Sequence, residues 1–134
     1  MNEIPYHPML VHFPIALYVL EAVLLIFWAV KKDTAFRRFA LFVFRAGYLT
    51  MIAAWITGYF EGGGLPDILK YERLENHFTA ATTLLIFYTL RAGVWKGIKP
   101  GSAADHWIHL AGALIGCVIV AVTGYFGGLM VHSR

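Results

Sequence analysis

Four of the six histidines lie near the ends of long apolar stretches, at positions that would gather on one side of a membrane. They are His7, His12, His77 and His132. An unpaired polar side chain is costly in hydrocarbon, so ionisable groups in membrane segments commonly have a function. Two neutral imidazoles that face one another across a helical bundle can supply both axial nitrogens of a haem iron. We therefore expect these histidines to bind one or two haems.

The cysteine content decides which type of haem is compatible. Cys117 is the only cysteine and no Cys-x-x-Cys-His motif occurs, so covalent c-type attachment is excluded and any haem would be b-type. Imidazole alone does not discriminate among metals, so the same four histidines could instead hold copper, iron or zinc. A third alternative is a scaffold subunit without a cofactor. A glycine-rich phosphate loop and the H-E-x-x-H motif are also absent. None of these motifs identifies a reaction, so the sequence leaves open whether the protein is an enzyme.

A porphyrin also needs a flat slot between helices, and small residues can provide one. The candidates to line it are Gly58, Gly124 and Gly128, the last two belonging to a series with Gly112 and Gly116. The alternative reading of these glycines is close helix packing, since small residues at four-residue spacing let two backbones approach.

The composition indicates how these residues are positioned. Of 134 residues, 59% are hydrophobic and only 14% charged, whereas a soluble domain carries about 25% charged residues. A bilayer-spanning helix needs roughly 20 apolar residues. The apolar stretches predict four spans in a single domain of residues 1–134, at about 8–30, 37–60, 75–95 and 102–131. The predicted fold is an all-α integral membrane protein, with an interfacial helical turn within 65–74.

An internal similarity predicts how the spans are arranged. Residues 57–60 and 123–126 are both Thr-Gly-Tyr-Phe, and a His-Phe pair precedes each at nearly the same distance, at 12–13 and 77–78. Two such hairpins enter the membrane in the same direction, so a pseudo-twofold axis along the membrane normal should relate them. The predicted fold is thus a four-helix transmembrane bundle built from two parallel-repeat hairpins.

The repeat assigns roles to the histidines. His12 and His77 become equivalent and are expected to face one another and sandwich one iron. His7 and His132 are expected nearer the surface, where they could bind a second haem or metal or contact the ligands of the first.

The basic residues predict orientation. Most of the eleven Lys and Arg residues fall on the side of the loops near 31–38 and 96–99, whereas Lys70, Arg73 and Arg134 lie on the other side. Basic loops are retained in the cytoplasm, so both termini should face the periplasm of a bacterial inner membrane. The net charge of +3 reflects this bias and not nucleic-acid binding.

Other polar residues within the spans have structural interpretations. Glu21 and Arg45 should lie at similar depth, so we expect a buried ion pair between them. Arg91 is expected to extend to the inner surface. His106 and His109 have metal-ligand spacing but no evident third ligand, so we expect them to be wetted at the interface.

The opening segment also resembles a known family. Residues 7–17, HPMLVHFPIAL, resemble the opening signature of bacterial predicted four-span membrane proteins known as domain of unknown function 2231. The His77 region and residues 124–132 look like that family's later motifs, although the chain ends in Ser133-Arg134 where the family pattern ends in His-Gly. The resemblance implies the topology and the importance of the histidines, but no reaction.

The histidines and the topology lead to one functional expectation. The protein should be a b-type cytochrome, or a subunit of one, that transfers electrons near the periplasmic face. Quinol or a periplasmic redox protein is the expected exchange partner, and an oligomer or larger complex is the expected assembly in the lipid bilayer.

Overall fold

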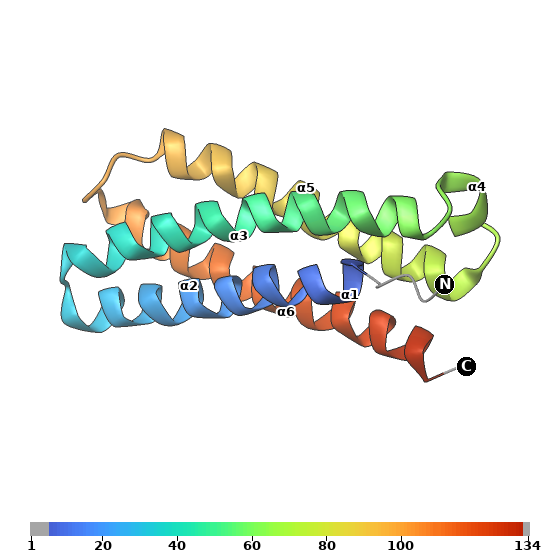
Figure 1. Ribbon diagram of the computed structural model, residues 1–134. Coiled ribbons are helices and arrows are strands. Elements are labelled where there is room, and N and C mark those ends of the chain that lie inside the picture. Colours follow the sequence, from blue (N-terminus) through green and yellow to red (C-terminus); the bar gives the residue numbers. More distant parts are fainter. Residues whose placement is uncertain (1–5, 133–134) are drawn as a thin grey trace.

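The computed structural model describes residues 6–132, and within this range every regular element is a helix (Figure 1). The helices are α1 Tyr6–Leu10, α2 His12–Lys31, α3 Thr34–Glu61, α4 Leu65–Ile68, α5 Glu72–Gly97 and α6 Ala103–Val131. Helices α1 and α2 are almost continuous, because Val11 between them keeps helical backbone angles and its N–H donates to the His7 carbonyl at 3.1 Å.

Short turns force the successive long helices to run antiparallel. Lys32 takes a left-handed conformation with φ 57° and ends α2, and the Asp33 carboxylate caps α3 by accepting from Ala35 N–H at 2.9 Å. At the other end, Gly63 and Gly64 have φ of 82° and 76°, which residues with a side chain rarely adopt. These glycines turn the chain from α3 into α4.

The four long helices pack around a common centre in the order α2, α3, α5, α6, with α6 returning against α2. Helices α2 and α5 therefore lie diagonally across the centre. The short helices α1 and α4 lie at one end together with the carboxyl end of α6 (Figure 1). We name this the histidine end, after His7 and His77, and name the opposite end, with the turns at 32–33 and 98–102, the basic end.

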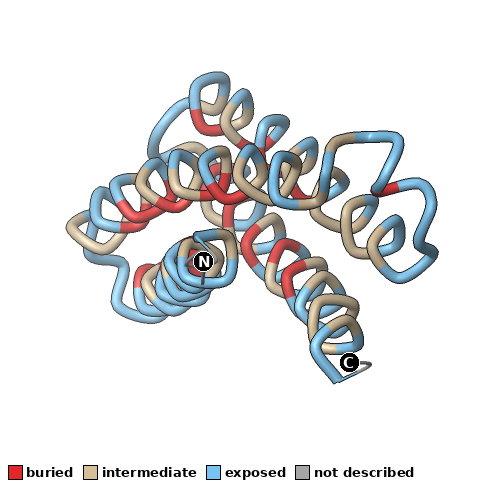
Figure 2. Tube along the Cα trace, turned by 45° about the vertical axis from the view of Figure 1, so that its right-hand side comes forward, coloured by how far each residue is buried: buried red, intermediate tan, exposed pale blue. Residues whose placement is uncertain are grey.

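Side chains from all four long helices fill the centre. Tyr18, Leu25, Phe44, Tyr88 and Ala113 are almost completely buried, and the buried positions follow the inward sides of the long helices (Figure 2).

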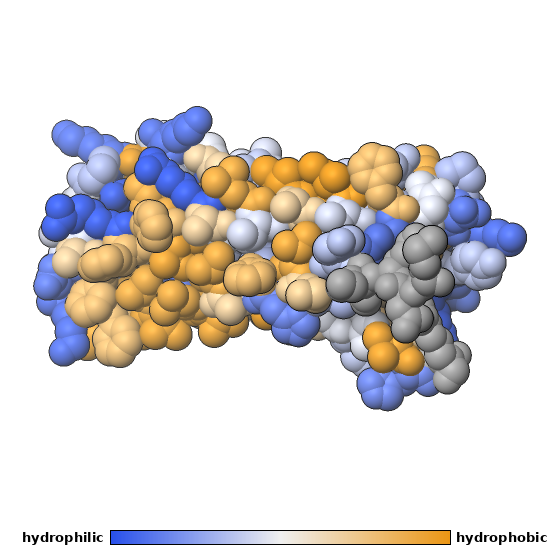
Figure 3. All heavy atoms as spheres, viewed as in Figure 1, coloured by the Kyte–Doolittle hydropathy of each residue, from blue (hydrophilic) through white to orange (hydrophobic). Residues whose placement is uncertain are grey.

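The outward faces are strongly apolar. Phe42, Leu90 and Val118 are each about two-thirds exposed or more, and an apolar band separates two hydrophilic ends (Figure 3). Three helical stretches are long and apolar enough to cross a membrane, namely Tyr6–Lys31, Thr34–Glu61 and Ala103–Val131. Three of the four predicted spans are thus candidates on length and composition.

Helix α5 is the one long helix outside that set, and its polar residues explain why. Thr82 accepts a hydrogen bond from Trp55 Nε1 at 3.0 Å, and Thr89 is bonded to the Tyr48 hydroxyl at 2.8 Å. These partners lie on α3, so two of the threonines that lower the hydropathy of α5 are bonded to the neighbouring helix.

Candidate functional site

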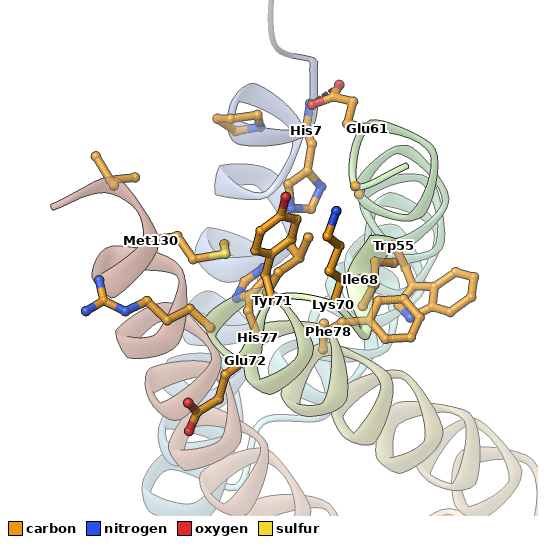
Figure 4. Close-up of a pocket in the computed structure, with 17 residues that line it drawn as sticks. His7, Trp55, Glu61, Ile68, Lys70, Tyr71, Glu72, His77, Phe78 and Met130 are labelled. Atoms are coloured by element: carbon orange, nitrogen blue, oxygen red, sulfur yellow. Dashed lines mark hydrogen bonds between the residues drawn. The ribbon is translucent and has the colours of Figure 1, made fainter. Parts of the chain in front are cut away.

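At the histidine end, two imidazoles lie beside one another. His7 is on α1 and His77 near the start of α5, and their ring centroids are 6.1 Å apart with planes at 76° (Figure 4). The Nδ1 atom of His7 is bonded to the carbonyl of Ala54 on α3 at 2.8 Å, and that of His77 to the carbonyl of Thr123 on α6 at 3.1 Å. Each ring is thus fixed by a helix other than its own.

These bonds determine which ring nitrogen can bind a ligand. A carbonyl oxygen only accepts, so Nδ1 must carry the proton in both neutral rings. Nε2 then keeps its lone pair, which is the arrangement found in metal-binding histidines whose other nitrogen donates to a carbonyl. His7 and His77 are therefore both set up to donate an electron pair through Nε2.

Glycines make room for both rings. A Cβ atom on Gly58 would lie 2.8 Å from His7 Cε1, and one on Gly127 would lie 3.3 Å from His77 Cε1. Each glycine follows the carbonyl-bearing residue, Ala54 or Thr123, by one helical turn. The two histidines are therefore held by the same kind of contact: each ring bonds a backbone carbonyl of another helix and packs against the glycine one turn later.

Two cavities meet at the histidine pair. An apolar cavity of about 410 Å³ extends toward the centre of the bundle and ends at Tyr18, Met51 and Leu84. A second cavity of about 1130 Å³ extends toward the α4–α5 turn, with Lys70 and Arg73 among its lining residues. The histidine pair lies at the junction of an apolar cavity and a cavity whose lining includes charged side chains.

The structure assigns the expected ligand residues differently from the sequence. The ring that lies beside His77 is that of His7, whereas His12, the partner we expected, is exposed and bonds Pro8 O of its own turn at 2.7 Å through Nδ1. His132 is also exposed and bonds Gly128 O at 2.9 Å. The helical phase explains the difference, because His7 on α1 points into the bundle and His12, five residues later, lies at its rim.

The predicted glycines divide into two groups. Gly124 and Gly128 line the apolar cavity, and Gly58 contacts His7. Gly112 and Gly116 instead receive the side chains of Arg91 and Tyr88. This second part of the glycine series therefore serves helix packing, the alternative interpretation.

No group of three His, Cys, Asp or Glu residues that could hold a metal ion occurs within residues 6–132. Within this range the four expected histidines therefore do not form one such group, although His12 lines the apolar cavity together with His7 and His77. The thioether side chain of Met130 does line both cavities with His7 and His77.

Below the cavities lies a buried ion pair that the sequence assigned wrongly. Arg91 donates to both carboxylate oxygens of Glu21, at 2.6 Å and 3.0 Å, and the two residues are 5% and 0% exposed. Arg45, the expected partner, is exposed on α3. Arg91 does not extend to the surface as expected, because Glu21 lies diagonally across the bundle and holds it at the centre.

Three contacts of α5 with α1 and α2 share one register. His7 with His77, Tyr18 with Tyr88, and Glu21 with Arg91 are each separated by 70 positions. The two tyrosine rings are stacked with centroids 3.7 Å apart. This register pairs His77 with His7, whereas the Thr-Gly-Tyr-Phe alignment pairs it with His12.

At the basic end, the histidines of α6 are packed and not wetted. His109 is 1% exposed and stacks on Trp95 at 3.6 Å, and His106 lies 4.1 Å from Trp28 between ring centroids. The carboxylate of Asp105 accepts two hydrogen bonds of 2.8 Å from Arg37. The sequence did not predict this cluster. Its α6 residues contact Trp28, Arg37 and Trp95 of three other helices, and such distant partners leave no pattern in the local sequence.

The apolar helices and the apolar surface between two hydrophilic ends define a helical membrane protein. The chain belongs to the family of predicted membrane proteins designated domain of unknown function 2231, whose family model matches residues 3–134. This match confirms the resemblance of the opening motif. Comparisons with curated proteins and with solved structures found no match.

Proposed function

We propose that the protein binds one b-type haem between His7 and His77 and transfers electrons at the histidine end. The observation that carries the proposal is the pair of imidazoles with free Nε2 atoms and centroids 6.1 Å apart. If both Nε2 atoms point to one iron, two metal–nitrogen bonds of about 2.0 Å, extended by the radius of each ring, give roughly this separation. The perpendicular ring planes are compatible, since an axial imidazole can rotate about its bond to iron.

The number of ligands favours haem over a bare metal ion. Structural zinc sites use four protein ligands and catalytic sites three. Haem iron needs only the two axial ligands from the protein, since the porphyrin supplies the other four. Two facing histidines therefore suit haem better than they suit zinc or non-haem iron.

The two cavities match the shape of such a group. A porphyrin plane is perpendicular to its axial bonds, so a group held between His7 and His77 would extend along the bundle in one direction and toward the α4–α5 turn in the other. These are the directions of the apolar cavity and of the cavity with charged side chains in its lining. The apolar lining by Met51, Leu84 and Val120 would exclude water from one edge.

When bound, haem would supply a one-electron couple. The chain's own contribution is to hold two imidazoles in a fixed tautomer. The carbonyls of Ala54 and Thr123 accept the Nδ1–H bonds, which raises the basicity of Nε2 and stabilises the higher charge on the metal.

The proposed arrangement in the bilayer has four spans, with α5 as the least apolar of them and its Arg91 buried in the bundle. The hairpin of α1, α2 and α3 would be related to that of α5 and α6 by a pseudo-twofold axis, which the contacts 70 positions apart support. The histidine end would face the periplasm of an inner membrane, because Lys31, Lys32, Lys96 and Lys99 lie at the basic end. Quinol or a periplasmic redox protein would exchange electrons there, within an oligomer or a larger complex.

A visible spectrum of the protein purified in detergent from haem-replete cells tests the proposal. A Soret band with sharp α and β bands on reduction, one haem per chain and a low-spin state would support it. A protein that takes up neither cellular haem nor added haemin would contradict it.

Copper is a second candidate, and Met130 is the observation that favours it. Thioether and imidazole ligands together suit Cu(I), and Met130 lines both cavities with the two histidines. Elemental analysis of the same sample would then find copper in the absence of a Soret band.

A further inference from the structure

We propose that Lys70, assisted by Arg73, binds the carboxylates of the group held by His7 and His77, and so orients that group with its charged edge toward the α4–α5 turn. The inference rests on the proposed function, because it names the side chains that recognise the propionates of b-type haem.

The two compartments around the histidine pair differ in polarity. The cavity toward the bundle centre is bounded by apolar side chains, such as Leu84 and Val120. The cavity on the other side has charged side chains in its lining, the basic Lys70 and Arg73 and the acidic Glu61 and Glu72, beside apolar ones such as Phe78. A ligand that fills both must have an apolar body and a charged or polar edge.

The position of Lys70 indicates the sign of that charge. Its side chain extends into the cavity beside the His7 ring (Figure 4), and its ammonium group lies 5.5 Å from the centre of the Tyr71 ring. Within residues 6–132, no carboxylate lies at ion-pair distance from Lys70. Lys70 is exposed and faces the cavity, so its ammonium group can bind an anionic ligand without first breaking an ion pair within the described part of the chain.

Two acidic residues, Glu61 and Glu72, line the same cavity, but neither forms an ion pair with Lys70. Glu61 accepts a hydrogen bond of 2.9 Å from the backbone N–H of His7, which stabilises its charge at the end of α3. Glu72 points away from Lys70 (Figure 4). Arg73 donates through one Nη1–H to Leu129 O at 3.1 Å, and its remaining N–H groups stay available to a second carboxylate.

The position of Lys70 distinguishes a ligand with carboxylates from a neutral ligand. A quinone head or a bare metal ion would use the histidines but gain nothing from Lys70. A porphyrin with two propionates gains a charge-assisted hydrogen bond at the polar edge, and its macrocycle remains in the apolar compartment.

Equilibrium binding of haemin and of haemin dimethyl ester to the purified, haem-depleted full chain tests the inference. The ester keeps the macrocycle and the iron but has no carboxylate charge. Lys70→Gln should weaken haemin binding about fivefold, as expected for a partly solvated charge pair, and should leave binding of the ester unchanged. Lys96→Gln, an exposed lysine of α5 at the basic end, is the matched control and should affect neither ligand.

Each result decides between the two claims. Equal loss of haemin and ester affinity in Lys70→Gln, or no loss of either, would overturn the role of Lys70 while leaving haem binding intact. A wild type that binds neither compound would overturn the proposed function and this inference with it. The low-spin spectrum should persist in Lys70→Gln, since His7 and His77 still supply the ligands.

Discussion

Removal of one partner of the Glu21–Arg91 pair should destabilise the protein more than any single surface change. Arg91 makes two hydrogen bonds to a carboxylate that is 0% exposed, so Arg91→Met leaves that carboxylate buried without a partner. Such a change costs about 3–5 kcal/mol. With an unfolding entropy of roughly 2.1 cal/mol/K per residue, a chain of 134 residues should melt roughly 10 °C lower or more.

Differential scanning fluorimetry in one detergent can measure this with a complete mutant cycle. Glu21→Leu should also lower the melting temperature, and the double variant Glu21→Leu with Arg91→Met should recover much of the loss, because both buried charges are gone. Arg45→Met is the control, since Arg45 is exposed, and should change the melting temperature little. Additive losses in the double variant, or a larger loss from Arg45→Met, would refute the assignment of the pair.

Two further predictions concern the site and the topology. Gly58→Ala should lower haem affinity about tenfold, because the new Cβ would lie 2.8 Å from His7 Cε1 and overpacking costs about 1–3 kcal/mol. Gly127→Ala should lower haem affinity less, because its Cβ would lie 3.3 Å from His77 Cε1. Gly93→Ala is the control and should leave haem affinity unchanged, because nothing lies within 4 Å of its Cβ. Unchanged haem titration curves for both site variants would contradict these contacts. An alkaline phosphatase reporter fused after Arg134 should be active in the periplasm and one inserted at Asp33 inactive, and the reverse pattern would contradict the orientation.

Local sequence signals predict the helices well because each boundary depends on nearby residues. Lys32 with Asp33 ends one helix and starts the next, and Gly63 with Gly64 turns the chain where a residue with a side chain would be strained. Membrane character follows equally directly from the apolar composition. The exception is α5, which has threonines and Arg91 within its apolar stretch and so a lower hydropathy; one of the threonines, Thr82, is bonded to Trp55 on α3.

Partners across the bundle could not be predicted in the same way. Depth along a helix follows from counting residues, and it correctly placed Glu21 in the interior. The side of the helix that faces the centre depends on how the helices pack, and that selected Arg91 over Arg45. The wrong partner was therefore a consequence of helix rotation, which residue counts do not determine.

The histidine pair shows the same limit. The identical Thr-Gly-Tyr-Phe motifs suggested that Gly124 corresponds to Gly58, but the glycine that receives the His77 ring is Gly127. Because α6 offers glycines on two successive turns, the sequence contained no signal for which of them makes the contact. Contact with Gly127 instead of Gly124 shifts the alignment of the two hairpins. As a result His7, and not His12, lies beside His77.

The most direct test of the central claim is the electron paramagnetic resonance and visible spectrum of four histidine variants, each loaded with haem under the same conditions. His7→Ala and His77→Ala should each abolish the low-spin signal of two imidazole ligands, through loss of haem or conversion to a high-spin form. His12→Ala and His132→Ala should keep the wild-type signal and one haem per chain. Loss of the low-spin signal in His12→Ala, together with its retention in His7→Ala, would contradict the binding of haem between His7 and His77.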